Sequence, residues 1–239
     1  MTELAIPQPA STVVLVRPDA SGSFEIFMNR RPEHMDSYAG MYVFPGGRVE
    51  RSDWSETMLS LIRGVSPRQA QQVLGCDLQP DLCLGYWVAA VRELFEEAGI
   101  HFFIDRQGAP LKTAKGTITG SLADKRRALQ QGELAFPNLL DAESLHCDLG
   151  PLNYFFHRVT PEHYSMRFDT RFYLAALPPE QEPLQASEEV SESVWIAPKE
   201  ALASNQSKNL PMMPPTLAVL RTLAEQPSWV ALRQAYRIS

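Results

Sequence analysis

The stretch from Trp87 to Gly99 places the strongest constraint on how this chain can fold. Its apolar side chains recur at the spacing of one helix face, at Trp87, Val91, Leu94, Phe95 and Ala98. A period near 3.6 residues indicates an amphipathic α-helix, and Gly99 stands where helices commonly end. Such an apolar stripe must be buried, so the fold has to provide a second packed layer beside this helix.

Three carboxylates project from another face of the same helix. Glu93, Glu96 and Glu97 stand at positions i, i+3 and i+4, which are neighbours on a helix surface. Like charges this close repel one another unless a cation lies among them, and hard oxygen ligands of this kind suit Mg²⁺ or Mn²⁺. A solvated acidic face is the alternative. Arg92, directly before the carboxylates, and a Gly-Gly turn upstream favour the metal site.

Local signals elsewhere predict an alternation of strands and helices. Strands are expected over 11–16, 24–29, 41–47, 152–160, 171–177 and 194–196, and helices within 54–84 and 120–145 and over 216–225 and 228–236. The expected helix caps are Ser66, Thr216 and Ser228 at amino ends, and Gly75 and Gly132 at carboxyl ends. This order favours one α+β domain spanning 1–239, with helical insertions at about 54–84 and 120–145 and a helical C-terminal tail.

Charge and hydropathy exclude several classes of partner. The net charge is −6 and no basic run stands out, so a nucleic-acid backbone is not expected as the main partner. No stretch approaches the roughly 18 consecutive apolar residues of a membrane-spanning helix. The N-terminus also lacks the charged start and apolar middle of a signal peptide. We therefore expect a cytoplasmic protein that binds neither nucleic acid nor membrane.

Two passages resemble the Nudix box. The stretch RELFEEAGI (Arg92–Ile100) is similar to its second half, and FPGGRVE (Phe44–Glu50) is similar to its opening. The Nudix family comprises Mg²⁺-dependent hydrolases of nucleoside diphosphates linked to another moiety. The resemblance implies a Nudix α/β/α sandwich with a mixed sheet, enlarged here by helical insertions. Arg92 stands 45 positions after Gly47, so about 31 residues interrupt the usual box.

An interrupted box of this sort is similar to a Nudix branch that cleaves coenzyme A and its thioesters. Three further passages resemble that branch: FMNRRP from Phe27, RFDTRFY from Arg167 and WIAPKEAL from Trp195. Asn29 and Pro32 depart from the Thr and Ser usual in the first of these. The resemblance implies hydrolysis of coenzyme A or acyl-CoA to 3′,5′-ADP and (acyl-)phosphopantetheine. The alternatives are a diphosphatase for ADP-ribose, NADH or a nucleotide sugar, and a non-catalytic Nudix-fold binding module.

The resemblance also implies roles for the residues of the box. Glu93, Glu96 and Glu97 would hold the divalent ion, with the carbonyl region of Gly47 supplying another oxygen. Arg92 would pair with a carboxylate of the box and orient it, or else form an ordinary surface ion pair. A glutamate of the second half, or one from a later loop, would act as the base, and which one serves is not assigned. Glu189 is a later acidic candidate for a metal ligand.

Further residues are candidates for contacts with the substrate or the metal. Arg31, with Arg30 as runner-up, is the candidate for a phosphate contact, because a planar guanidinium can hold two phosphate oxygens. Gly46 and Gly47 allow the backbone to approach a bound group closely or to take a positive φ. Glu50 and Asp53 are expected to join the metal cluster or to support it, or to be structural only.

The two insertions are too apolar to be loose loops. Leu59, Leu61, Ile62, Val73 and Leu74 of the first need a surface to cover. The insertions are expected either to roof the site and select an acyl chain or to form a homodimer face, and the sequence leaves both open.

Overall fold

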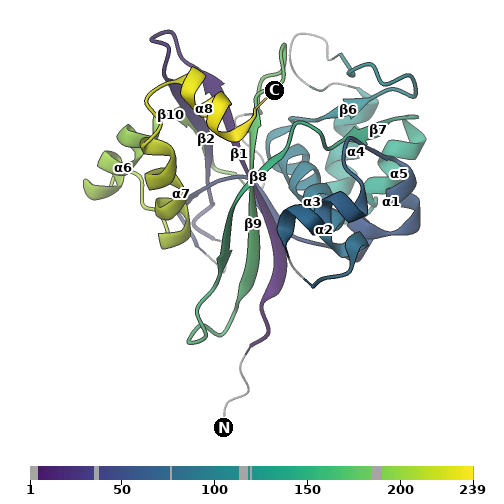
Figure 1. The fold of residues 1–239 in the computed structure, drawn as a ribbon, viewed down its shortest axis with the longest axis horizontal. Coiled ribbons are helices and arrows are strands. Elements are labelled where there is room, and N and C mark those ends of the chain that lie inside the picture. The colour runs from purple at the N-terminus through teal and green to yellow at the C-terminus, as the bar shows by residue number, and fades with distance from the viewer. Residues whose placement is uncertain are drawn as a thin grey trace.

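A mixed β-sheet stands between two helical layers (Figure 1). The computed structural model describes residues 5–34, 38–75, 77–112, 118, 120–184 and 190–238. The strands of the main sheet are β1 (Gln8–Pro18), β2 (Phe24–Arg30), β3 (Tyr42–Val43), β4 (Gly46–Arg48), β8 (Asn153–Val159), β9 (Phe168–Ala176) and β10 (Glu192–Ile196). Their order is β10-β2-β1-β9-β8, with β3 on β2 and β4 on β1. Strands β1 and β9 are parallel and the other pairs are antiparallel.

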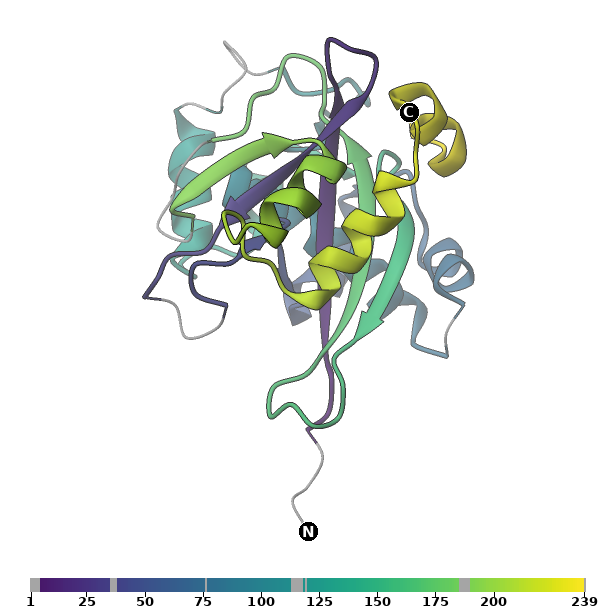
Figure 2. The same cartoon turned by 90° about the vertical axis from the view of Figure 1, so that its left-hand side faces the viewer.

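The helices divide between the two faces of the sheet. One layer holds the 3-10 helix η1 (Arg51–Trp54), α1 (Glu56–Ser60), α2 (Pro67–Leu74), α3 (Pro80–Ala98), α4 (Ser121–Gln130) and α5 (Phe136–Ala142). It also contains a small sheet of β5 (Ile62–Arg63), β7 (His146–Asp148) and β6 (Phe103–Ile104). The other layer holds α6 (Pro198–Gln206), α7 (Pro214–Ala224) and α8 (Trp229–Tyr236), and Figure 2 shows α6 and α7 crossing its face of the sheet. The expected α+β sandwich with a mixed sheet is confirmed.

The central strand β1 is apolar on both sides because it separates two cores. Val13 and Leu15 belong to the core beneath α3, whereas Val14 and Val16 belong to the core beneath α6 and α7. A strand buried on both faces reads as a continuous apolar run rather than an alternating one. This explains the run of apolar residues from Val13 to Val16.

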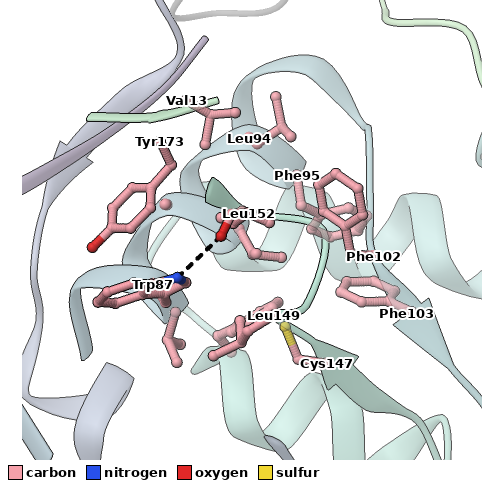
Figure 3. Packing of buried hydrophobic residues seen from close by; sticks show 14 of the residues in the cluster. Val13, Trp87, Leu94, Phe95, Phe102, Phe103, Cys147, Leu149, Leu152 and Tyr173 are labelled. Atoms are coloured by element: carbon pink, nitrogen blue, oxygen red, sulfur yellow. Dashed lines mark hydrogen bonds between the residues drawn. The ribbon is translucent and has the colours of Figure 1, made fainter. Parts of the chain in front are cut away.

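Helix α3 is covered on its sheet face and also on its outer face. The predicted stripe is buried, and Gly99 ends the helix with the positive φ of 69° that glycine tolerates best. Cys147 and Leu149 pack in the same core as Trp87 and Val13 (Figure 3). Apolar residues of both insertions join this core as well, among them Met58, Leu74, Phe136 and Leu139. The buried apolar side chains of the insertions therefore cover α3. Val73 is an exception, because 53% of its surface is exposed.

The inserted helix α4 closes the carboxyl end of α3. Nε of Arg126 donates to the carbonyl of Phe95 at 2.9 Å, and its Nη2 donates to the carbonyls of Glu96 and Glu97. Nε2 of Gln130 donates to the carbonyl of Glu96 at 2.8 Å. The last carbonyls of a helix have no partner within the helix, and positive charge there is favourable. The insertion thus fixes the end of α3 that carries the carboxylates.

Several expected elements differ from the structure. The segment 54–84 is not helical throughout, because Ile62 and Arg63 pair with distant residues of β7. Helix α7 begins at Pro214 rather than at Thr216, since prolines in the first turn leave fewer N–H groups to be capped. Helix α6 was not anticipated, although Pro198 in its first turn is a usual signal for a helix start.

The other expected helix ends are confirmed. Ser66 and Ser228 accept backbone N–H groups as N-caps, and Gly75 and Gly132 both have positive φ. Within the described residues, no helix has the length and apolar character needed to cross a membrane.

Phe136→Ala tests whether the second insertion is part of the α3 core. The side chain is fully buried in α5, with its ring 5.9 Å from that of Phe103. We expect a loss of about 3–5 kcal/mol in the free energy of unfolding, measured in urea, because the cavity left behind collapses only partly. The control Val73→Ala removes an exposed side chain and should change this free energy by less than about 0.5 kcal/mol. Equal effects of the two changes would show that the insertion packs independently of the core.

Arg126→Met tests the closure of α3 by α4. It removes donors to buried carbonyls while keeping much of the side-chain volume, so we expect a loss of about 1–3 kcal/mol in the free energy of unfolding. Faster amide hydrogen exchange in the last turn of α3 should accompany it. The control is Arg127→Met on the same helix, whose exposed ion pair with Asp124 contributes at most about 1 kcal/mol. Unchanged stability and exchange in Arg126→Met would rule out this role.

Candidate functional site

A buried ion pair connects the two ends of the first insertion. Nε of Arg92 lies 2.8 Å from Oδ1 of Asp53, and Nη2 lies 3.0 Å from Oδ2. The two side chains are only 3% and 0% exposed. The two-pronged contact matches the planar guanidinium to the carboxylate and fixes both in position. The alternative expectation of a surface ion pair at Arg92 is therefore wrong.

The same guanidinium also contacts helix α3 and strand β4. Nη1 of Arg92 lies 2.9 Å from Oε1 of Glu93 and 3.0 Å from Oε1 of Glu96, while Nη2 donates to the carbonyl of Arg48 at 2.8 Å. Burial alone would lower the pKa of Arg92, but the carboxylates around it outweigh burial and raise the pKa above its ordinary value. Arg92 therefore stays charged and orients two of the three predicted ligands.

The Gly-Gly turn brings β4 against both β1 and α3. A Cβ on Gly47 would lie 2.2 Å from Oε1 of Glu93, and one on Gly46 would lie 2.4 Å from the carbonyl oxygen of Ser11. Both glycines are thus required for close approach, and neither has a positive φ. The carboxylate of Glu93 rests on Gly47, so the structure brings these two predicted ligands together. Gly46 packs on the backbone of β1.

The third carboxylate, Glu97, points to a different neighbour. It is 6% exposed, and its Oε2 accepts a hydrogen bond of 3.1 Å from Nδ2 of Asn29 on β2. From the sequence, Asn29 was noted only as a departure from the Thr that is usual in the FMNRRP passage, and its contact with Glu97 was not predicted. The available signal is its position on β2. Asn29 stands two residues after Phe27, so both side chains lie on the face of the strand that packs toward α3.

The donor set fits a hard divalent cation. Asp53, Glu93 and Glu96 contact the guanidinium of Arg92, so three carboxylates face one positive charge, and Glu97 lies one turn beyond Glu93 on the same helix. Burial is the largest cause that raises the pKa of Glu93 to about 8; repulsion by Glu96 adds to it, and Arg92 opposes it. A divalent cation would supply the missing positive charge through carboxylate oxygens.

Rearrangement must accompany such binding. Among the residues that the structure describes, no three acidic, histidine or cysteine side chains already converge as a ligand set. The carboxylates of Glu93 and Glu96 are turned toward Arg92. Rotation of these side chains about their own torsions is the smallest change that would present their oxygens to an ion.

The two arginines near β2 differ in their surroundings. Arg30 pairs with Glu33 at 2.8 Å and donates to the carbonyl of Gly40. Arg31 continues the extended backbone past β2, since its N–H donates to the carbonyl of Met41. Side chains alternate along an extended chain, so Arg31 lies on the same side as Asn29 and Arg30 on the other. This placement favours Arg31 as the residue nearer to the carboxylates.

The remaining acidic candidates are less central. Asp53 is fully used by Arg92 and by the N–H of Glu50, so it supports the carboxylate set rather than opening toward a ligand. Glu50 is itself exposed and caps η1. Glu189 lies outside the described residues.

Comparisons with known proteins identify the family to which the chain belongs. The family model described as the NUDT19 Nudix domain matches residues 5–223. The acyl-coenzyme A diphosphatase NUDT19 of Gallus gallus is 27% identical over 227 residues, covering 80% of this chain and 59% of the relative. The human protein of the same name is 26% identical over 252 residues, covering 91% of this chain and 65% of the relative. The chain thus spans about three fifths of the length of these relatives.

A solved structure resembles the whole described fold. The crystal structure of a NUDIX hydrolase from Alicyclobacillus acidocaldarius superposes with a TM-score of 0.81 at 28% sequence identity, covering 99% of this chain and 100% of that one. Coverage this complete includes the insertions and the C-terminal helices. From the matched family model and this shared architecture, we conclude that the chain belongs to the NUDT19 Nudix domain family.

Proposed function

We propose that this chain is a divalent-metal-dependent diphosphatase that acts on coenzyme A or acyl-CoA. Its products are 3′,5′-ADP and phosphopantetheine or acyl-phosphopantetheine. The observation that carries the proposal is the set of three carboxylates, Asp53, Glu93 and Glu96, that contact Arg92 beside the Gly47 turn. The names of the relatives from chicken and human support the choice of substrate.

The residues of the site suit hydrolysis of a phosphoanhydride. Water attacks one phosphorus of the diphosphate, the bond from that phosphorus to the bridging oxygen breaks, and the water oxygen stays on the attacked phosphate. A bound Mg²⁺ or Mn²⁺ supplies positive charge that offsets the phosphate oxygens and makes the attacking water more acidic. Glu93, Glu96, Glu97 and the carbonyl of Gly47 are the groups that would hold it once the carboxylates rotate.

The chain's own groups divide the remaining tasks. Arg92 holds the carboxylates of Glu93 and Glu96 in place and balances part of their charge. Arg31 contacts a phosphate and positions the substrate beside α3. One glutamate takes the proton of the attacking water, and the geometry leaves open which one serves. The site specifies the bond that is broken, so the group attached to the nucleotide has to be tested directly.

Product analysis tests the substrate. Purified protein incubated with Mg²⁺ or Mn²⁺ and coenzyme A should release 3′,5′-ADP, detected by chromatography. Glu97→Gln should abolish the reaction, with a melting temperature nearly unchanged or slightly raised, because one repelling carboxylate is gone. The matched control is Glu56→Gln on the exposed first turn of α1, which should retain full activity.

Three outcomes would contradict the proposal in different ways. Hydrolysis of ADP-ribose, NADH or a nucleotide sugar without hydrolysis of coenzyme A would reject the substrate. Binding of nucleotides without any hydrolysis would indicate a non-catalytic module. Full activity of Glu97→Gln would show that the carboxylates of α3 are not the metal site.

Arg31 and Arg30 form a matched pair for the phosphate contact. Arg31→Ala should lower kcat/KM for coenzyme A by about ten- to a hundredfold, mainly through KM, because a charge-assisted hydrogen bond to phosphate is lost. Arg30→Ala removes a neighbouring guanidinium that already pairs with Glu33 and should have an effect below about threefold. Steady-state kinetics of both variants decide the assignment, and the reverse order of effects would transfer the role to Arg30.

A further inference from the structure

Asn29 and Ser193 form a polar chain that ends on Glu97; Asn29 and Glu97 are buried and Ser193 is half-buried. Nδ2 of Asn29 donates to Oε2 of Glu97 at 3.1 Å, although the two residues are 68 positions apart. Oδ1 of the same amide accepts a hydrogen bond of 2.9 Å from Oγ of Ser193. Asn29 and Ser193 are direct cross-strand partners on β2 and β10. The carboxylate of α3 is therefore tied to two strands of the sheet.

The chemistry of the three groups fixes the direction of the chain. An ionised carboxylate only accepts hydrogen bonds, so the NH₂ end of the Asn29 amide must face Glu97. The carbonyl end then faces Ser193, whose hydroxyl can donate to it. Asn29 is 1% exposed and lies in a strand with partners on both edges, so its side chain has little freedom to leave this position.

The three carboxylates of α3 are thus held by different means. A guanidinium holds Glu93 and Glu96 and offsets their charge, whereas a neutral amide holds Glu97. A neutral donor can fix the rotamer of a long side chain without adding positive charge that would compete with a bound cation. Groups that orient metal ligands in this way typically contribute ten- to a hundredfold to metal affinity or activity.

We propose that Asn29, supported by Ser193, is a positioning residue that holds Glu97 for a divalent cation. The inference rests on the proposed function in that it takes Glu97 as a metal ligand. The competing explanation is that Asn29 only satisfies a buried carboxylate and contributes to stability alone. Metal affinity measured without substrate separates the two, because a purely structural amide would not change it.

The test measures Mn²⁺ dissociation constants by electron paramagnetic resonance of the free ion. Asn29→Leu removes both hydrogen bonds at similar volume and should weaken Mn²⁺ binding by about tenfold or more. In a Glu97→Gln background the same change should weaken binding by less than about twofold, because Asn29 acts through Glu97. Ser193→Ala should weaken binding in the same direction by a smaller factor, and it keeps the proposal testable if Asn29→Leu does not fold.

The matched control is Met28→Leu on the same strand. Met28 is fully buried in the opposite core, so this change perturbs the packing of β2 without touching Glu97. Its Mn²⁺ affinity should equal that of the unchanged protein. An Asn29→Leu protein with unchanged affinity, or with the same loss in both backgrounds, would overturn the proposal.

The same measurement distinguishes this proposal from the proposed function. If the unchanged protein binds no Mn²⁺, the metal site is wrong and both proposals fail. If it binds Mn²⁺ with the predicted dependence on Asn29 but hydrolyses no nucleotide, the proposed function fails and the positioning role stands.

Discussion

The guanidinium of Arg92 is the contact on which the rest of the site depends. It joins η1 through Asp53, β4 through the carbonyl of Arg48, and two carboxylates of its own helix. A buried ion pair of this kind often stabilises a fold less than well-packed apolar residues would. Its value here is positional, because the consecutive elements β4 and η1 are held at one point on helix α3, 39 to 44 positions further along the chain. Removing Arg92 would leave the buried carboxylate of Asp53 without its ion-pair partner.

The carboxylates of α3 are oriented from three sides. Arg92 of α3 itself donates to Glu93, and Asn29 of the sheet donates to Glu97. Arg126 of α4 donates to the backbone carbonyl of Phe95 near the carboxyl end of α3. The layer formed by the insertions covers the outer face of the helix. The helix that carries the acidic residues is therefore restrained along its sheet face, along its outer face and at its carboxyl end, as the proposed metal site requires.

The parts that were predictable from the sequence depend on local signals. The helical period of the Trp87 stripe, the caps at Ser66 and Gly99, and the apolar run of β1 are all readable within one or two turns of chain. The pairing of β5 with β7 and the bond from Asn29 to Glu97 join residues far apart, and no local pattern marks them. The resemblance implied that Arg92 pairs with a carboxylate of the box, but it did not identify Asp53 as that partner.

The interruption of the box is compatible with an intact site because its two ends meet in space. Asp53 contacts Arg92, and the Trp54 side chain next to Asp53 lies against Gly85, where a Cβ would come within 3.1 Å of it. The intervening chain therefore leaves and returns at nearly the same place, and the entropy of closing such a loop rises only slowly with its length. A segment of another length could therefore be accommodated at this junction while Asp53 and Arg92 keep their contact.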